Sequence, residues 1–200
     1  MGRNHLCVAA LAAAVLFAGP AAASDEVGAG GGFVSGALHP ILGFDHLLAM
    51  IAVGLLSVQM GGRAIWYVPA AFVAIMALGG FLGLQGVALP QVEGAIALSV
   101  FAIGLAIAMG AQPAVWLAML FVGFFAIFHG HAHGAEIPRL AAPGAYVGGF
   151  LLATAGLHLT GVALGELCRL FSRPAQSRAL LGAGSAGIGL HMLLLSYAVV

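Results

Sequence analysis

The chain has 200 residues, of which 62% are hydrophobic and 6% are charged, and its formal net charge is zero. Soluble proteins carry about 25% charged residues, so this composition excludes an ordinary soluble domain. It also excludes nucleic acid as a partner, because no basic patch is present. Long apolar runs argue against a transmembrane β-barrel, which would show weak alternating segments. The sequence therefore predicts an all-α, polytopic membrane helix bundle embedded in a lipid bilayer.

Residues 1–23 are typical of a secretory signal peptide. Arg3 gives the positive start, residues 6–18 form the apolar stretch, and the alanines at 21–23 fit a cleavage site before Ser24. An uncleaved first membrane helix is the alternative interpretation. In either case, Ser24 is predicted to lie outside the cytoplasm.

Six apolar segments follow a short glycine-rich leader, and each is close to the roughly 20 residues that a spanning helix needs. Turns rich in glycine and proline separate them, and no soluble domain fits between them. We therefore predict a single six-helix transmembrane domain over residues 24–200. The helices are expected near 33–58, 64–84, 91–110, 114–131, 144–168 and 178–199.

The arginines predict how this bundle is oriented. With Ser24 outside, the loops on the cytoplasmic side hold Arg63, Arg169, Arg173 and Arg178, whereas the outer side holds only Arg139. This bias agrees with the positive-inside rule. Both termini of the mature chain are thus expected to face the periplasm, as a multi-pass protein of a bacterial inner membrane.

Three titratable residues interrupt the first apolar segment, in HPILGFDH: His39, Asp45 and His46. Ionisable groups at membrane depth are costly, and they commonly mark an ion or proton pathway. Pro40 tends to kink a helix, and a kink beside Gly43 would bring His39 toward Asp45 and His46. The alternative is that the glycines serve close helix packing and the histidines hydrogen-bond neighbouring helices.

A second group ends the fourth segment, in FHGHAHGAE. His129, His133 and Glu136 share a helical face at i, i+4 and i+7, whereas His131 points elsewhere if the helix continues. Imidazoles beside carboxylates form a good ligand set for a divalent transition metal. A solvated loop of histidines with no fixed role is the alternative. The sequence predicts a metal site built from His39, Asp45, His46, His129, His133 and Glu136.

Four further residues are possible additional ligands or pathway residues: Glu93, His131, His158 and His191. For His158 and His191 the simpler interpretation is an interhelical hydrogen bond. Glu93 would also be explained as a residue at the membrane edge that reaches water. Nearly all of the candidates are expected in the outer half of the bundle.

The two motifs resemble those of the HupE/UreJ family of nickel permeases. The family pattern HPxxGxDH is matched at residues 39–46, and FHGxAHGxE is matched at residues 128–136. The resemblance spans the signal, the six helices and both motifs in order. It implies uptake of Ni²⁺ across the bacterial inner membrane to supply the maturation of hydrogenase or urease.

We predict a permease for a divalent transition metal, Ni²⁺ by this resemblance, with Co²⁺ or Zn²⁺ as competitors, no organic cofactor and no enzymatic activity. Since histidine ligates metal only when neutral, binding should weaken below roughly pH 6. The chain has no lysine and therefore no Walker-type ATP site. The alternatives are an intramembrane metal sensor, a metalloenzyme and a proton or cation channel.

Overall fold

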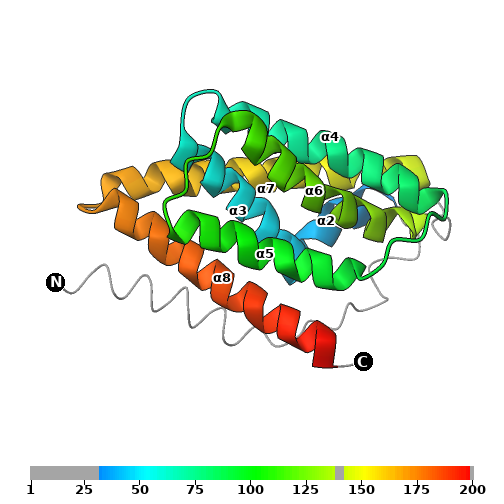
Figure 1. Cartoon of the computed structure of the whole chain (residues 1–200). Helices are drawn as coiled ribbons and strands as arrows, with labels where there is room; N and C mark the ends of the chain where they lie inside the picture. The colour runs from blue at the N-terminus through cyan, green and yellow to red at the C-terminus, as the bar shows by residue number, and fades with distance from the viewer. Residues whose placement is uncertain (1–31, 138–141, 199–200) are drawn as a thin grey trace.

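The computed structural model describes residues 32–137 and 142–198, and this part of the chain is helical without strands (Figure 1). The predicted all-α fold is confirmed, whereas the predicted signal peptide lies outside the described residues. The elements are α2 (Phe33–Leu42), α3 (Phe44–Met60), α4 (Ala64–Leu84), α5 (Val92–Ala108), α6 (Val115–Gly134), α7 (Pro143–Leu167), the 3₁₀ turn η2 (Cys168–Leu170) and α8 (Pro174–Ala198).

Four helical segments are long and apolar enough to cross a membrane: α4, α6, α7 continued by η2, and α8. The bent pair α2 and α3 adds a fifth span if it is counted as one. The remaining predicted span, α5, is apolar but only 17 residues long. All six predicted segments are therefore helical in the described chain, but four or five of them meet the requirements for a span.

The first predicted helix is not continuous, and here the prediction of one helix over 33–58 is wrong. It is split at Gly43 into α2 and α3, whose axes differ by 81°. Pro40 lies in the last turn of α2 and cannot donate a backbone hydrogen bond. Gly43 is extended, with φ −73° and ψ 104°, so that it ends α2 and precedes the first turn of α3. The change of direction expected near Pro40 is present, but it takes the form of a break between two separate helices rather than a kink within one helix.

Two other boundaries differ from the sequence prediction by three residues or more. Helix α6 continues to Gly134, three residues beyond the expected end, despite its glycines. Helix α8 begins at Pro174 rather than at 178, because proline fits the first turn of a helix, where its missing N–H group has no intrahelical partner.

Glycines allow the helices to pair at close range. The most extensive contacts are α4 with α6, α5 with α8, and α7 with both α2 and α3. A Cβ atom on Gly130 of α6 would overlap with the backbone carbonyl of Met76 on α4, and one on Gly54 of α3 would overlap with that of His158 on α7. Small residues that let backbones approach are the usual means of packing membrane helices.

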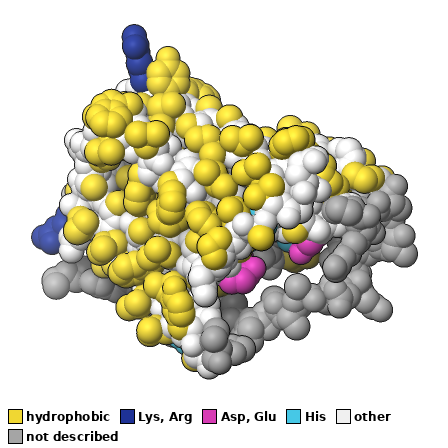
Figure 2. Space-filling view, turned by 45° about the vertical axis from the view of Figure 1, so that its right-hand side comes forward, with side chains coloured by type: hydrophobic (Ala, Val, Ile, Leu, Met, Phe, Trp, Pro, Cys, Tyr) yellow, Lys and Arg dark blue, Asp and Glu magenta, His cyan; other side chains and the backbone are white. Residues whose placement is uncertain are grey.

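The interior and the surface of the bundle are both apolar. The core contains fully buried Met50, Leu56, Phe72, Met76 and Ile103. Hydrophobic side chains also cover most of the face seen in Figure 2, where basic side chains lie at the left margin and acidic ones lie to the right, beside histidine. An apolar exterior that carries few charges fits a lipid-facing surface.

Candidate metal centre

The break at Gly43 builds one side of a histidine cluster. In a continuous helix, His39 and His46 would lie about 10 Å apart along the axis. In the structure, their ring centroids are 6.5 Å apart, and each ring also contacts His133 at the end of α6, with centroid separations of 4.4 Å and 4.5 Å. The two motifs predicted from the sequence therefore meet at one place.

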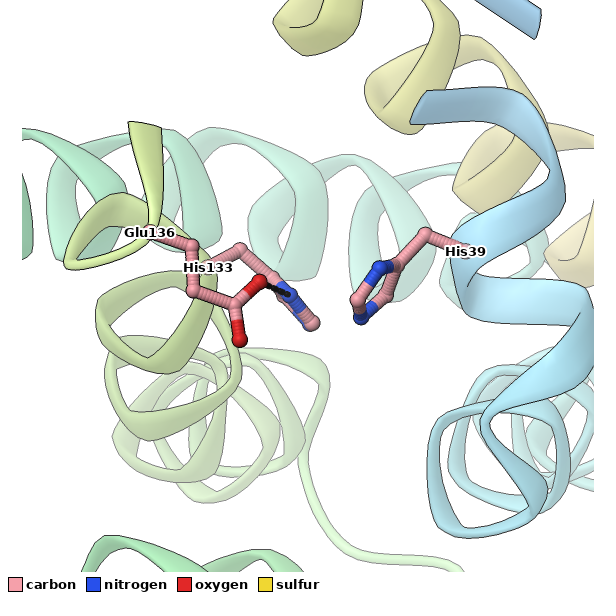
Figure 3. Close-up of side chains that lie close together, drawn as sticks. All are labelled: His39, His133 and Glu136. Atoms are coloured by element: carbon pink, nitrogen blue, oxygen red, sulfur yellow. Dashed lines mark ion pairs between the residues drawn. The ribbon is translucent and has the colours of Figure 1, made fainter. Parts of the chain in front are cut away.

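The most exposed part of this arrangement brings together His39, His133 and Glu136 (Figure 3). One ligand atom from each residue lies within 4.8 Å of the others. His133 is buried, His39 is partly buried and Glu136 is exposed, so the three residues run from the surface inward. In Figure 3 the His39 ring from α2 points toward His133 and Glu136, whose side chains form an ion pair of 4.0 Å if His133 is protonated. We call these residues, together with His46, the Glu136 cluster.

Asp45 lies behind His46. Its Oδ1 atom accepts the backbone N–H of His46 at 2.7 Å and lies 2.8 Å from the Nδ1 atom of the same residue. Since a carboxylate accepts hydrogen bonds, this contact assigns the proton of a neutral His46 ring to Nδ1 and leaves the lone pair on Nε2. That Nε2 atom lies 2.7 Å from Nε2 of His133. The carboxylate therefore orients a neutral imidazole toward the cluster, as partners of metal-binding histidines commonly do.

His129 lies one turn before His133 on α6 and is fully buried. Its ring centroid is 4.6 Å from that of His46, and its Nε2 atom is 2.9 Å from the hydroxyl of Ser99 on α5. Ser99 was not among the residues predicted from the sequence. The only available signal was a single hydroxyl residue within the apolar segment 94–103.

The structure separates the four additional candidates from the Glu136 cluster. His131 points away, as predicted, and its Nε2 atom contacts the carbonyl of Val87. Glu93 is exposed at the start of α5, and His191 is exposed on α8. His158 is buried on α7 and its ring packs against Phe72.

Helix α7 contributes two aromatic residues that sequence reasoning did not single out. The ring of Phe150 packs at 4.4 Å from the ring of His133, and that of Tyr146 lies 6.0 Å from that of His39. Both are buried. Their sequence signal was weak, because a Tyr and a Phe four residues apart in an apolar helix look like ordinary packing. Here they cover the side of the imidazoles that faces α7.

Known proteins resemble this chain over most of its length. The family described as HupE / UreJ protein matches residues 11–192. The protein HupE of Rhizobium leguminosarum bv. viciae is 44% identical over 163 residues, which cover 82% of this chain and 84% of that protein. No solved structure matches. A family match over most of the length, with a relative of this identity, shows that the chain belongs to the HupE/UreJ family.

Proposed function

We propose that the protein is a multi-pass permease of the bacterial inner membrane that takes up a divalent transition metal, with Ni²⁺ as its substrate. The single observation that supports this most strongly is the meeting of His39, His133 and Glu136 from two distant chain segments. Family membership supports the same proposal. The delivered metal would serve hydrogenase or urease maturation, and the protein itself would catalyse no reaction.

In this proposal the exposed carboxylate of Glu136 attracts the hydrated cation, and the imidazoles of His133 and His39 then replace some of its water. His46 would take the ion next, since its lone pair on Nε2 already faces His133. Imidazole and carboxylate ligands suit Ni²⁺, Co²⁺ and Zn²⁺. Selection among these ions would therefore depend on the geometry of the site rather than on ligand type.

The membrane potential is a sufficient driving force for such a permease. One elementary charge gains about 2.3 kcal/mol per 100 mV, so a divalent cation gains about 4.6 kcal/mol. That corresponds to an accumulation of more than 10³-fold, since about 1.4 kcal/mol is a factor of ten. We propose gradient-driven uptake from the periplasmic side, where the Glu136 cluster lies in the orientation predicted from the arginines.

Uptake by reconstituted liposomes tests this function. Purified protein in vesicles with an inside-negative potential should accumulate ⁶³Ni²⁺, with Co²⁺ and Zn²⁺ as competitors. His133→Ala and Glu136→Gln should abolish most of the uptake, whereas His191→Leu, which changes an exposed histidine of α8, should leave it unchanged. Equal uptake by empty vesicles and by the wild-type protein would overturn the proposal.

A further inference from the structure

Two buried histidines lie deeper in the bundle than the Glu136 cluster. His129 is four residues before His133 on α6, which places it about 6 Å farther along that helix. On α7, Phe150 contacts His133, and His158 follows eight residues later, about 12 Å farther along its helix. The rings of His129 and His158 both contact the ring of Phe72, at 5.6 Å and 5.2 Å. We call these two histidines the deep pair.

Ser99 determines which nitrogen of His129 carries the proton. The Ser99 hydroxyl donates to the carbonyl of Ile96 at 2.6 Å. It has only one proton, so toward Nε2 of His129, 2.9 Å away, it must accept. The ring proton of His129 is therefore on Nε2, and the lone pair is on Nδ1. That Nδ1 atom is buried and has no hydrogen-bond partner within the described chain.

His158 does not show the interhelical hydrogen bond that a packing role would give it. Its side chain is 1% exposed, and neither ring nitrogen has a partner among the described residues. A neutral imidazole always has one donor and one acceptor, and burying both without partners is unfavourable. His158 is also among the residues that line an apolar groove of about 410 Å³ between α4 and α7, on the half of α4 that begins near Ile65. His158 thus lies between the histidine cluster and the opposite half of the bundle.

We propose that His129 and His158 form a second binding site for the transported divalent cation, with Ser99 as its positioning residue. Nδ1 of His129 would donate one lone pair and the ring of His158 another, while the cation keeps part of its hydration shell. The unpartnered nitrogens would gain a partner whenever an ion is bound. This inference rests on the proposed permease function, because it adds a later step to the same path.

Equilibrium dialysis of the purified protein against Ni²⁺ alone tests the deep site separately from transport. The wild-type protein should bind two equivalents, and His158→Leu should bind one. His191→Leu is a matched control, since Gly189-Leu190-His191-Met192 repeats the local pattern of Gly156-Leu157-His158-Leu159 in an exposed position. It should still bind two. Two equivalents in His158→Leu, or one in the wild type, would overturn the inference.

The stability of His158→Leu distinguishes a metal-binding role from a purely structural one, which would predict a less stable variant. A metal-binding role predicts the following result. His158→Leu removes two unpaired polar atoms, so the variant should unfold at the same temperature or higher, while uptake of ⁶³Ni²⁺ into liposomes falls at least tenfold. His158→Gln, which keeps a polar side chain but ligates metal poorly, provides a second variant and should also bind one equivalent. A variant that binds two equivalents and transports normally contradicts the deep site and leaves the permease function intact.

Ser99 is tested through the electronic spectrum of bound metal. Ser99→Ala should lower the affinity for the second Co²⁺ ion by about 10–100-fold, which is the usual effect of removing a group that orients a metal-binding histidine. Ser99→Thr retains the hydroxyl and should restore both the affinity and the visible absorption of Co²⁺. Equal Co²⁺ binding and spectra in Ser99→Ala would overturn the positioning role. If vesicles with the wild-type protein fail to take up Ni²⁺, the proposed permease function is overturned. The binding measurements would still test whether His129 and His158 bind a metal ion.

Discussion

His46 and His133 are 87 residues apart in sequence, yet their Nε2 atoms lie 2.7 Å apart. The contact joins the first turn of α3 to the last turn of α6, two helices that otherwise touch only slightly. It places a lone pair of one imidazole against the N–H group of the other. A cation bound by both Nε2 atoms would require that proton to move from Nε2 to Nδ1 of His133, so metal binding and hydrogen bonding compete for the same two atoms.

The Asp45 carboxylate should be needed for metal affinity even though it lies behind His46. Asp45→Asn can present an amide N–H to the ring, which would turn the imidazole or move its proton to Nε2. We expect the half-saturating concentration for Ni²⁺ uptake to rise by about 10–100-fold. Kinetic uptake assays check this, with Asp45→Glu as the control that keeps the charge. Unchanged kinetics in Asp45→Asn would show that the carboxylate does not orient the ring.

Gly43 should tolerate a methyl group but not a larger side chain. Its backbone angles are open to any L-residue, and a Cβ atom there would lie 3.4 Å from Oδ1 of Asp45 and 3.5 Å from Nδ1 of His46. Gly43→Ala should therefore retain uptake, whereas Gly43→Leu should push against Asp45 and His46 and lower it. The two variants are compared at equal protein abundance in the membrane. Equal activity of both variants would mean that the chain around Gly43 can shift to accommodate a larger side chain.

The contact between α4 and α6 should depend on Gly130. A methyl group there would overlap with the backbone carbonyl of Met76, which has no flexible part to move aside. Gly130→Ala should lower stability by about 1–3 kcal/mol, as overpacking usually does. Gly156→Ala on α7 is the control, because no atom lies within 4 Å of its added methyl group. Thermal unfolding in detergent measures both, and similar midpoints would contradict the packing argument.

Metal should stabilise the folded protein. A ligand that binds only the native state adds about 2.7 kcal/mol at a concentration of 100 times its dissociation constant. Ni²⁺ should therefore raise the unfolding temperature of the wild type, and a chelator should reverse the rise. His133→Ala should lose the part of this shift that comes from the Glu136 cluster, because His133 contacts both His39 and His46. An undiminished shift would place the stabilising metal elsewhere.

The predicted orientation can be checked by labelling single cysteines in a chain without Cys7 and Cys168. Gln85→Cys lies at the same end of the bundle as Glu136, and Arg173→Cys precedes α8 at the opposite end; both positions are exposed. A thiol reagent that cannot cross the membrane should label residue 85 in intact spheroplasts and residue 173 only after lysis. The reverse pattern would invert the topology derived from the arginines.

The sequence was sufficient for most of the helices, because apolar length is a local property, and the arginines placed both motifs in the same half of the bundle. The break at Gly43 was less visible, since Pro40 suggested a kink but the extended backbone of Gly43 depends on how α2 packs against α7. Ser99 could not be chosen from the sequence, because its role requires α5 to lie beside α6. For His158, a packing role was the simpler interpretation, and only its unpartnered nitrogens argue otherwise.

The glycine contacts join the helices of the bundle into separately packed groups. Helices α2 and α3 are joined to α7 backbone against backbone, and α4 is joined to α6 in the same way. His39 and His46 belong to the first group, whereas His133 and Glu136 belong to the second. The candidate metal ligands therefore come from two separately packed groups of helices, and an ion bound between them would hold these two groups together.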